Sequence, residues 1–293
     1  MKPRHLFMEC SIMELHRRKL IILLIIIVVL LYATLIEPNL LCITTLEFYS
    51  SKLTTKEPIV IAHISDLHIR HFGVRESKLA DILNKLKPDL VLITGDLIES
   101  EGGIAPLEQL LLRLENMTII VTLGNWDHRS GCTDKLLDTL KKFNVIVLRN
   151  ENTLLHVKEQ KLYIVGVDDF ITGHAHIEKA FLNVDRRYFV VAIMHSPDLV
   201  SDLAEHRPDL ILVGHTHGGQ VLGLLIGPIL RLIAGEHVCL SGLYVVKGVP
   251  VYVTRGIGCT LFDLRLLCPP EIAIIRLIGK SSCEDDECFA DLT

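Results

Sequence analysis

Several features that would assign a chemistry at once are missing from this sequence. The eight cysteines form no Cys-x-x-Cys pair, which argues against a zinc site built on thiolates, and buried free thiols are the expected state. No Gly-x-Ser-x-Gly motif is present to indicate a serine nucleophile. Basic residues are not in excess either. The net charge is −5, which disfavours nucleic acid as a partner.

Charge is also absent from one long hydrophobic run near the start of the chain. Residues 20–36 contain no charged side chain, and these 17 residues just reach the length that spans a bilayer. Basic residues come before the run, as they do in a signal peptide, but no small-x-small cleavage site follows it. We therefore expect a single uncleaved anchor in the cell (inner) membrane.

The orientation of this anchor stays open. The cluster Arg17, Arg18 and Lys19 favours a cytoplasmic N-terminus, so a full span would place the rest of the chain outside the cytoplasm. A shallow insertion of the short apolar run would leave the rest of the chain inside.

The expected organisation has five parts. They are a basic segment (1–19), a membrane-anchor helix (20–36), a linker (37–58), a globular domain (59–279) and an acidic tail (280–293). Within the domain, short apolar runs alternate with amphipathic stretches, as Ile59–Ile64 does with Glu76–Lys87. This pattern predicts a layered α/β fold with one mixed sheet or two sheets.

Five of the predicted strands end in residues that bind metals. The five strand ends are Asp66-Leu67-His68, Gly95-Asp96, Gly124-Asn125, His195 and Gly214-His215-Thr216-His217. One such residue after a strand is usually a turn or core residue, but chance does not explain five in order. Carboxylate, amide and imidazole ligands without thiolate suit Mn, Fe, Mg or Zn. Six or seven ligands suit two ions that share one carboxylate.

With these motifs, the chain resembles the calcineurin-like metallophosphoesterase superfamily over residues 59–277. The resemblance implies a four-layer αββα sandwich and two divalent ions, of which manganese is favoured. It implies that Asp66, His68 and His217 bind one ion, that Asn125, His195 and His215 bind the other, and that Asp96 bridges them. A hydroxide generated between the ions would attack phosphorus in line.

One position departs from the family pattern. The residue after Asn125 is usually a histidine that stabilises the transition state or protonates the leaving group, and here it is Trp126. His128 is the candidate replacement, with Asp127 to orient it, and an ordinary surface or supporting histidine is the alternative. Without such a group, the metals alone would favour substrates with a good leaving group, such as a pyrophosphate.

Two arginines are candidate substrate-binding residues. Arg255 follows a predicted strand and would pair with a substrate phosphate or form an ordinary salt bridge. Arg231 lies in the apolar stretch Val221–Ala234 and would suit a lipid headgroup. His174 and His176 imitate the Gly-His-x-His motif, but no clear apolar strand precedes them, so we expect them in a surface loop.

The motif GHTHGGQ after an N-terminal membrane segment resembles one branch of the superfamily. That branch contains YkuE-like and YaeI-like membrane-associated phosphoesterases and the chlamydial-type UDP-2,3-diacylglucosamine pyrophosphatases of lipid A synthesis. The resemblance implies a lipid-linked substrate and contact with the phospholipid bilayer, with the apolar stretch after the motif holding acyl chains. A phosphatase or phosphodiesterase for soluble substrates, merely tethered to the membrane, is the alternative. A non-catalytic scaffold is disfavoured because no ligand is missing.

Overall fold

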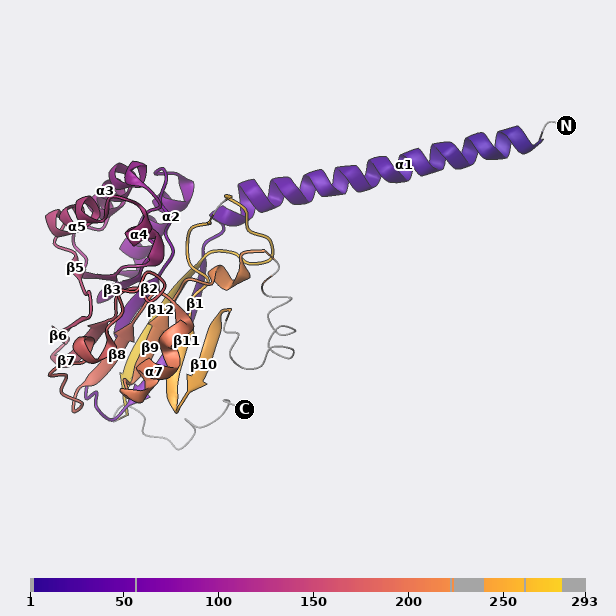
Figure 1. Cartoon of the computed structure of the whole chain (residues 1–293). Helices are drawn as coiled ribbons and strands as arrows, with labels where there is room; N and C mark the ends of the chain where they lie inside the picture. Colours follow the sequence, from indigo (N-terminus) through magenta and orange to yellow (C-terminus); the bar gives the residue numbers. More distant parts are fainter. Residues whose placement is uncertain (1–2, 56, 222, 224–239, 261, 281–293) are drawn as a thin grey trace.

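Two six-stranded sheets pack face to face and form the centre of the domain (Figure 1). The structure is a computed structural model that describes residues 3–55, 57–221, 223, 240–260 and 262–280. The first sheet has the order β1-β12-β2-β3-β4-β5 and the second β10-β11-β9-β8-β7-β6. The strands are β1 (Cys42–Ser50), β2 (Ile59–Ile64), β3 (Leu90–Thr94), β4 (Ile119–Thr122), β5 (Ile146–Val147), β6 (Glu151–Val157), β7 (Gln160–Gly166), β8 (Phe189–Ile193), β9 (Leu210–Val213), β10 (Gly242–Val246), β11 (Val249–Val253) and β12 (Glu271–Gly279).

Helices cover the outer face of each sheet. The α-helices are α1 (Pro3–Leu31), α2 (Val74–Leu86), α3 (Ile104–Arg113), α4 (Asn125–Arg129), α5 (Thr133–Lys142), α6 (Ile177–Ala180) and α7 (Val200–Glu205). Apolar residues of α2, α3 and α5 pack on the first sheet, and those of α6 and α7 pack on the second. A separate apolar cluster fills the space between the sheets. The predicted four-layer αββα sandwich is confirmed.

The central strands are mostly apolar because both faces of each sheet are covered. In β3, every residue is buried, and in β2 the residues Ile59, Ile61 and Ile64 are fully enclosed. Burying each such side chain contributes about 1.5–3 kcal/mol, so the sheets form a rigid support. The four cysteines whose side chains are described, Cys42, Cys132, Cys259 and Cys268, are free thiols.

The carboxyl ends of the central strands meet at one edge of the sandwich. Strands β2, β3 and β4 run parallel in the first sheet, and β7, β8 and β9 run parallel in the second. Thr122 at the end of β4 donates a hydrogen bond of 2.6 Å to the carbonyl of Val167, which follows β7. The loops that carry the predicted metal ligands therefore converge from both sheets.

Residues 42–50 correct the expectation of a linker over residues 37–58. They form β1, which pairs in parallel with β12 from Cys42↔Glu271 to Ser50↔Gly279. Burial along β1 alternates from residue to residue, as expected of a strand with one face in the core. The sheet sandwich thus begins well before residue 59.

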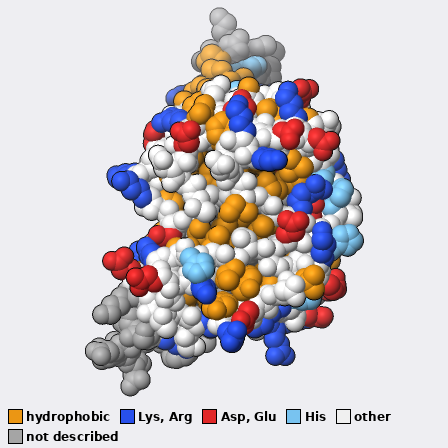
Figure 2. Space-filling view, turned by 90° about the vertical axis from the view of Figure 1, so that its left-hand side faces the viewer, with side chains coloured by type: hydrophobic (Ala, Val, Ile, Leu, Met, Phe, Trp, Pro, Cys, Tyr) orange, Lys and Arg blue, Asp and Glu red, His pale blue; other side chains and the backbone are white. Residues whose placement is uncertain are grey.

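One helix in the described part of the chain has the length and composition of a membrane-spanning segment. The apolar stretch covers Met13–Asn39, has a mean hydropathy of 3.0 and is mostly exposed. It comprises the part of α1 from residue 13 to its end, a π-helical turn (Tyr32–Ile36) and a 3₁₀ turn (Glu37–Asn39). In Figure 2, charges of both signs are spread over one face of the domain, and apolar side chains lie in patches down the middle of this face and at its top.

Candidate metal centre

The structure brings all seven predicted metal ligands together at the shared edge of the two sheets. Asp66 and His68 follow β2, Asp96 follows β3, and Asn125 opens α4 directly after β4. His195 follows β8, and His215 and His217 follow β9. Their side chains form two groups with ligand atoms close enough to hold a metal ion, Asp66–His68–His217 and Asp96–His195–His215.

The first group is almost closed to solvent. The Nε2 atoms of His68 and His217 lie 3.1 Å apart, and Nε2 of His217 lies 3.5 Å from Oδ1 of Asp66. The two imidazole rings are stacked with their centroids 4.9 Å apart. Two imidazole nitrogens and a carboxylate oxygen that face one another in a buried site are a donor set that suits a divalent cation.

The second group has the same character and includes the predicted asparagine. Nε2 of His195 lies 3.1 Å from Oδ2 of Asp96, 3.0 Å from Nδ1 of His215 and 3.1 Å from Oδ1 of Asn125. Three imidazole or carboxylate groups and one amide oxygen therefore surround one point. The burial of His195, Asp96 and Asn125 shields that point from bulk water.

One oxygen of Asp96 faces both groups. Oδ2 of Asp96 lies 3.1 Å from Nε2 of His195 in its own group and 3.6 Å from Nε2 of His68 in the other. The second oxygen, Oδ1, is already bonded, because it accepts the backbone N–H of Trp126 at 2.7 Å. This geometry leaves Oδ2 available to two ions, as the bridging position requires.

Backbone strain is concentrated at the predicted ligands. Five of the seven, namely Asp66, His68, Asp96, His215 and His217, have φ between 42° and 71°, a left-handed conformation that non-glycine residues rarely adopt. Such conformations cost free energy and persist where the surrounding structure enforces them, most often at functional sites. These left-handed conformations therefore lower the stability of the fold, and they direct the five side chains into the site.

Glycines allow the strand ends to approach one another. A Cβ atom at Gly124 would overlap the carboxylate of Asp96, and one at Gly214 would overlap Ser65 and lie 2.6 Å from Oδ2 of Asp66. Neither glycine has a positive φ, so space for the neighbouring carboxylate is what these two positions require.

Hydrogen bonds around the ligands fix their orientation. Nδ1 of His195 lies 2.8 Å from the carbonyl of Thr94, so this nitrogen donates its proton to the backbone and Nε2 is the nitrogen that faces the site. Oε1 of Glu99 lies 3.2 Å from Nδ1 of His68, at ion-pair distance but off the line of a hydrogen bond. Arg70 holds the same carboxylate through two bonds of 2.8 and 2.9 Å.

Sequence reasoning missed Glu99 as a residue of this site. Burial acts to raise the pKa of Glu99, but His68 and Arg70 outweigh it and lower the pKa to about 2, so the carboxylate is ionised at neutral pH. Its position three residues after Asp96 was the available signal. It stands on a loop, however, where spacing alone does not show that it reaches His68.

Asp127 does not orient His128, contrary to the expectation from the sequence, and instead holds the backbone. Its carboxylate accepts the N–H groups of Leu97, Ile98 and Gly124 and so ties together the loops after β3 and β4. Complete burial and then the neighbouring charge of Asp96 raise the pKa of Asp127 to about 7.

The ligand histidines are electrostatically coupled to the carboxylates. Burial acts to lower the pKa of His195, but the charge and hydrogen bond of Asp96 outweigh it and raise that pKa to about 10. The pKa of His217 is well below its ordinary value, because of burial and then of the neighbouring His68. A bound cation would replace the proton that Asp96 now stabilises on His195.

His128 lies one helical turn beyond Asn125 in α4 and is held by Asp168. Its Nε2 is 2.7 Å from Oδ1 of Asp168, whose other oxygen accepts Nε of Arg149 at 2.9 Å. The ring of His174 stacks on His128 with centroids 4.0 Å apart. His174 and His176 are exposed in the loop before α6, in agreement with the expectation of a surface loop.

Of the two arginines predicted to bind substrate, the structure describes Arg255. Its Nη2 forms a salt bridge of 3.2 Å with Oε1 of Glu271, which agrees with the alternative prediction of an ordinary salt bridge. Its aliphatic part packs beneath Gly218, directly after His217. Arg231 lies outside the described residues, as does most of the stretch Val221–Ala234.

A cleft of about 410 Å³ adjoins the metal centre. His215 and His217 form part of its wall, and Val221, Phe262 and Leu264 add an apolar side.

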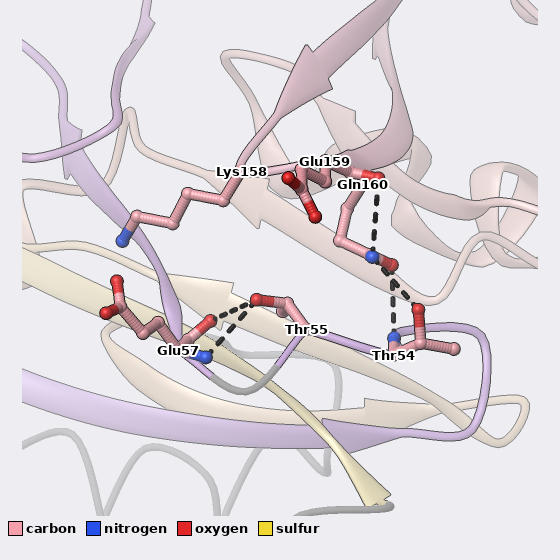
Figure 3. A pocket seen from close by; sticks show the side chains of 6 residues that line it. All are labelled: Thr54, Thr55, Glu57, Lys158, Glu159 and Gln160. Carbon is pink, nitrogen blue, oxygen red and sulfur yellow. Dashed lines mark hydrogen bonds between the residues drawn. The ribbon is translucent and has the colours of Figure 1, made fainter.

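A larger cavity of about 650 Å³ lies elsewhere, between Thr54 and the β6–β7 turn at Lys158–Gln160 (Figure 3). It is close to Pro58, at the start of β2, and so lies at the opposite edge of the sheet from the ligands.

The double sheet and the two groups of oxygen and imidazole side chains are consistent with a hydrolase that has a binuclear metal centre. The chain belongs to the calcineurin-like phosphoesterases, whose family model matches residues 59–219. It is therefore a metal-dependent phosphoester hydrolase with two potential metal-binding sites.

Curated relatives agree with this assignment. The chain is 29% identical to the uncharacterized metallophosphoesterase YkuE of Bacillus subtilis, over 84% of this chain and 88% of that protein. It is 30% identical to the phosphodiesterase YaeI of Escherichia coli, over 75% and 83%. It is 28% identical to a transmembrane protein with a metallophosphoesterase domain from Danio rerio, over 73% of this chain and 52% of that protein.

Proposed function

We propose that the chain is a membrane-associated phosphoesterase that cleaves a phosphoester or pyrophosphate bond of a lipid-linked substrate. The cleft beside the metal centre carries this proposal. On one side it has the histidines His215 and His217, and on the other it has Val221, Phe262 and Leu264. A substrate with a phosphate next to an acyl chain matches both sides.

The proposed metal assignment follows the geometry of the site. Asp66, His68 and His217 would hold one divalent cation, Asn125, His195 and His215 the second, and Asp96 both. The lack of thiolate ligands favours manganese, with iron, magnesium and zinc as alternatives. The cations would supply a hydroxide nucleophile and positive charge close to the phosphorus.

The residues that follow the metal ligand Asn125 in the chain determine which leaving group the site would prefer. Trp126 stands where the family usually has a histidine, and its ring meets the ring of His68 edge-on, with 6.2 Å between centroids. An indole cannot protonate a leaving oxygen. His128 is the proposed acid, with Asp168 as its orienting carboxylate. A weakly basic leaving group, such as a nucleoside phosphate, would need this help least.

Membrane association and substrate class are tested together in one assay. Full-length protein with Mn²⁺ in detergent or lipid nanodiscs is given UDP-2,3-diacylglucosamine, the substrate of the lipid A pathway, and a soluble chromogenic phosphodiester. We expect faster turnover of the lipid-linked compound, because the apolar wall of the cleft contributes binding only to an acyl chain.

The control is a pair of lipid-linked and soluble compounds with the same leaving group, so that chemistry and binding are separated. Hydrolysis of the soluble compounds alone would refute the lipid-linked substrate. It would instead support the alternative of a tethered phosphodiesterase for soluble substrates.

A further inference from the structure

The end of the apolar helix is fastened to the catalytic domain and not joined to it by a free tether. The backbone N–H of Arg265 donates to the carbonyl of Ala33 at 2.9 Å, and the ammonium of Lys78 donates to the carbonyl of Asn39 at 3.1 Å. Glu37 is 1% exposed, and its carboxylate accepts the N–H of Cys268. The helix end and the domain therefore keep one relative position.

Exposed apolar side chains surround this junction. We call them the base ring, and they are Leu35, Ile36, Leu40, Val74, Phe262 and Leu267. Two are among the most exposed large apolar residues in the described part of the domain, with Phe262 75% and Val74 61% exposed. Val74 lines one small cavity with Thr34 and Pro38, so it lies beside the end of the helix, and polar side chains such as Arg75 and Asp263 line the same cavity. Leu35 and Ile36 belong to the helix end itself, so the ring adjoins the apolar surface of the helix.

Because the apolar run is short, the base ring must lie close to the bilayer. The 17 residues from Leu20 to Ile36 extend about 25 Å as a helix. The hydrocarbon core of a bilayer is about 30 Å thick. With Lys19 at one headgroup layer, Ile36 has not yet left the opposite side of the membrane. The domain that holds Ala33 must then lie directly on the membrane surface.

The same loop connects the base ring to the metal cleft. Phe262 belongs to the ring and also lines the cleft with His215. Further along the loop, the N–H of Leu266 donates to the carbonyl of Gln220 at 3.1 Å, which is three residues after His217. The mouth of the cleft and the foot of the helix are therefore parts of one surface.

We propose that the base ring seats the domain on a phospholipid bilayer and that the metal cleft opens at the lipid interface. The occupant is the bilayer because the ring is continuous with an apolar helix of membrane-spanning length. This inference deepens the proposed function and rests on its membrane association. It adds that a substrate enters the cleft from the membrane through the side of Phe262, without first leaving the bilayer.

The test measures the depth of single tryptophans in full-length protein. Trp126 is the one tryptophan of the chain, so Trp126→Phe provides a silent background. Phe262→Trp reports on the base ring. Val245→Trp is the matched control, because Val245 is 63% exposed and stands beside the β10–β11 turn, at the opposite edge of the sheet. Each variant is placed in nanodiscs with ordinary or brominated phospholipid.

We expect brominated lipid to quench the fluorescence of the Phe262→Trp variant about twofold or more and to leave that of the Val245→Trp variant nearly unchanged, since interfacial side chains enter the headgroup and acyl boundary. An unchanged melting temperature shows that each variant is folded. No quenching in either variant, or equal quenching in both, would overturn the proposal. The quenching does not depend on substrate, so a lipid-linked substrate that proves wrong leaves this result standing, and the reverse also holds.

Discussion

At the residue scale, the metal centre depends on side chains that hold the ligands as much as on the ligands themselves. Thr94 fixes His195 through its carbonyl, and Glu99 faces the outer nitrogen of His68. Arg70 in turn holds the carboxylate of Glu99. Contacts of this kind select the imidazole tautomer and raise its affinity for a cation.

Glu99 is predicted to set metal affinity without touching substrate. Glu99→Gln should weaken Mn²⁺ binding about 10–100-fold, because the charge that orients His68 is lost. At saturating Mn²⁺, kcat should recover. Isothermal titration with Mn²⁺ measures the affinity. The matched control is Glu101→Gln, since Glu101 lies two residues further on and pairs with Lys135 at the surface. Equal affinities in wild type and Glu99→Gln would rule out this role.

His128 is predicted to act on the leaving group. His128→Ala should lower kcat about 10²-fold with an alkyl phosphodiester and much less with a nitrophenyl one, which needs no protonation. His174→Ala is the control, because it removes the stacking partner and keeps the His128–Asp168 pair. If kcat of His128→Ala stays within about twofold for both substrates, acid catalysis by this residue is excluded.

At the scale of elements, the site is built from the ends of parallel strands in two sheets. Each strand presents its ligands within the four residues after its end, and glycines leave room for the neighbouring strand end. Since the strands are held by buried apolar contacts on both faces, the ligand positions are fixed before a metal binds.

Gly124 provides a test of this packing. Gly124→Ala should destabilise the fold by about 1–3 kcal/mol, because the new methyl group overlaps the carboxylate of Asp96. It should also weaken metal binding. Urea unfolding of the metal-free protein gives the stability change. Gly102→Ala is the control, since a Cβ there meets only Ser100 Oγ at 3.7 Å. A Gly124→Ala protein as stable as Gly102→Ala would contradict the packing described here.

The sequence predicted which side chains gather at the strand ends, because each of them follows an apolar run that stands out along the chain. It did not predict β1, because CITTLEFYS alternates between exposed and half-buried residues and has no short apolar run. Only pairing with β12, more than two hundred residues later, makes it a strand. Glu99 and Asp168 were missed for the same reason, since their partners are distant or stand on loops.

At the scale of the whole molecule, an apolar helix, a ring of exposed apolar residues and a metal cleft follow one another on one surface. Ala33 and Glu37 dock on the loop that contains Phe262 and Cys268. The proposed chemistry depends on the binuclear centre, whereas the proposed seating on the bilayer depends on the base ring and the apolar helix.

Metal titration of the full-length protein tests that centre most directly. Metal-stripped protein receives increasing Mn²⁺, and bound metal and phosphodiester turnover are measured on the same samples. We predict that turnover rises with binding of two ions per chain. Asp96→Ala should remain folded in the metal-free state and lose about 10³-fold in kcat, since no carboxylate then joins the two groups. Full turnover in the stripped protein, or in Asp96→Ala, would contradict the binuclear mechanism.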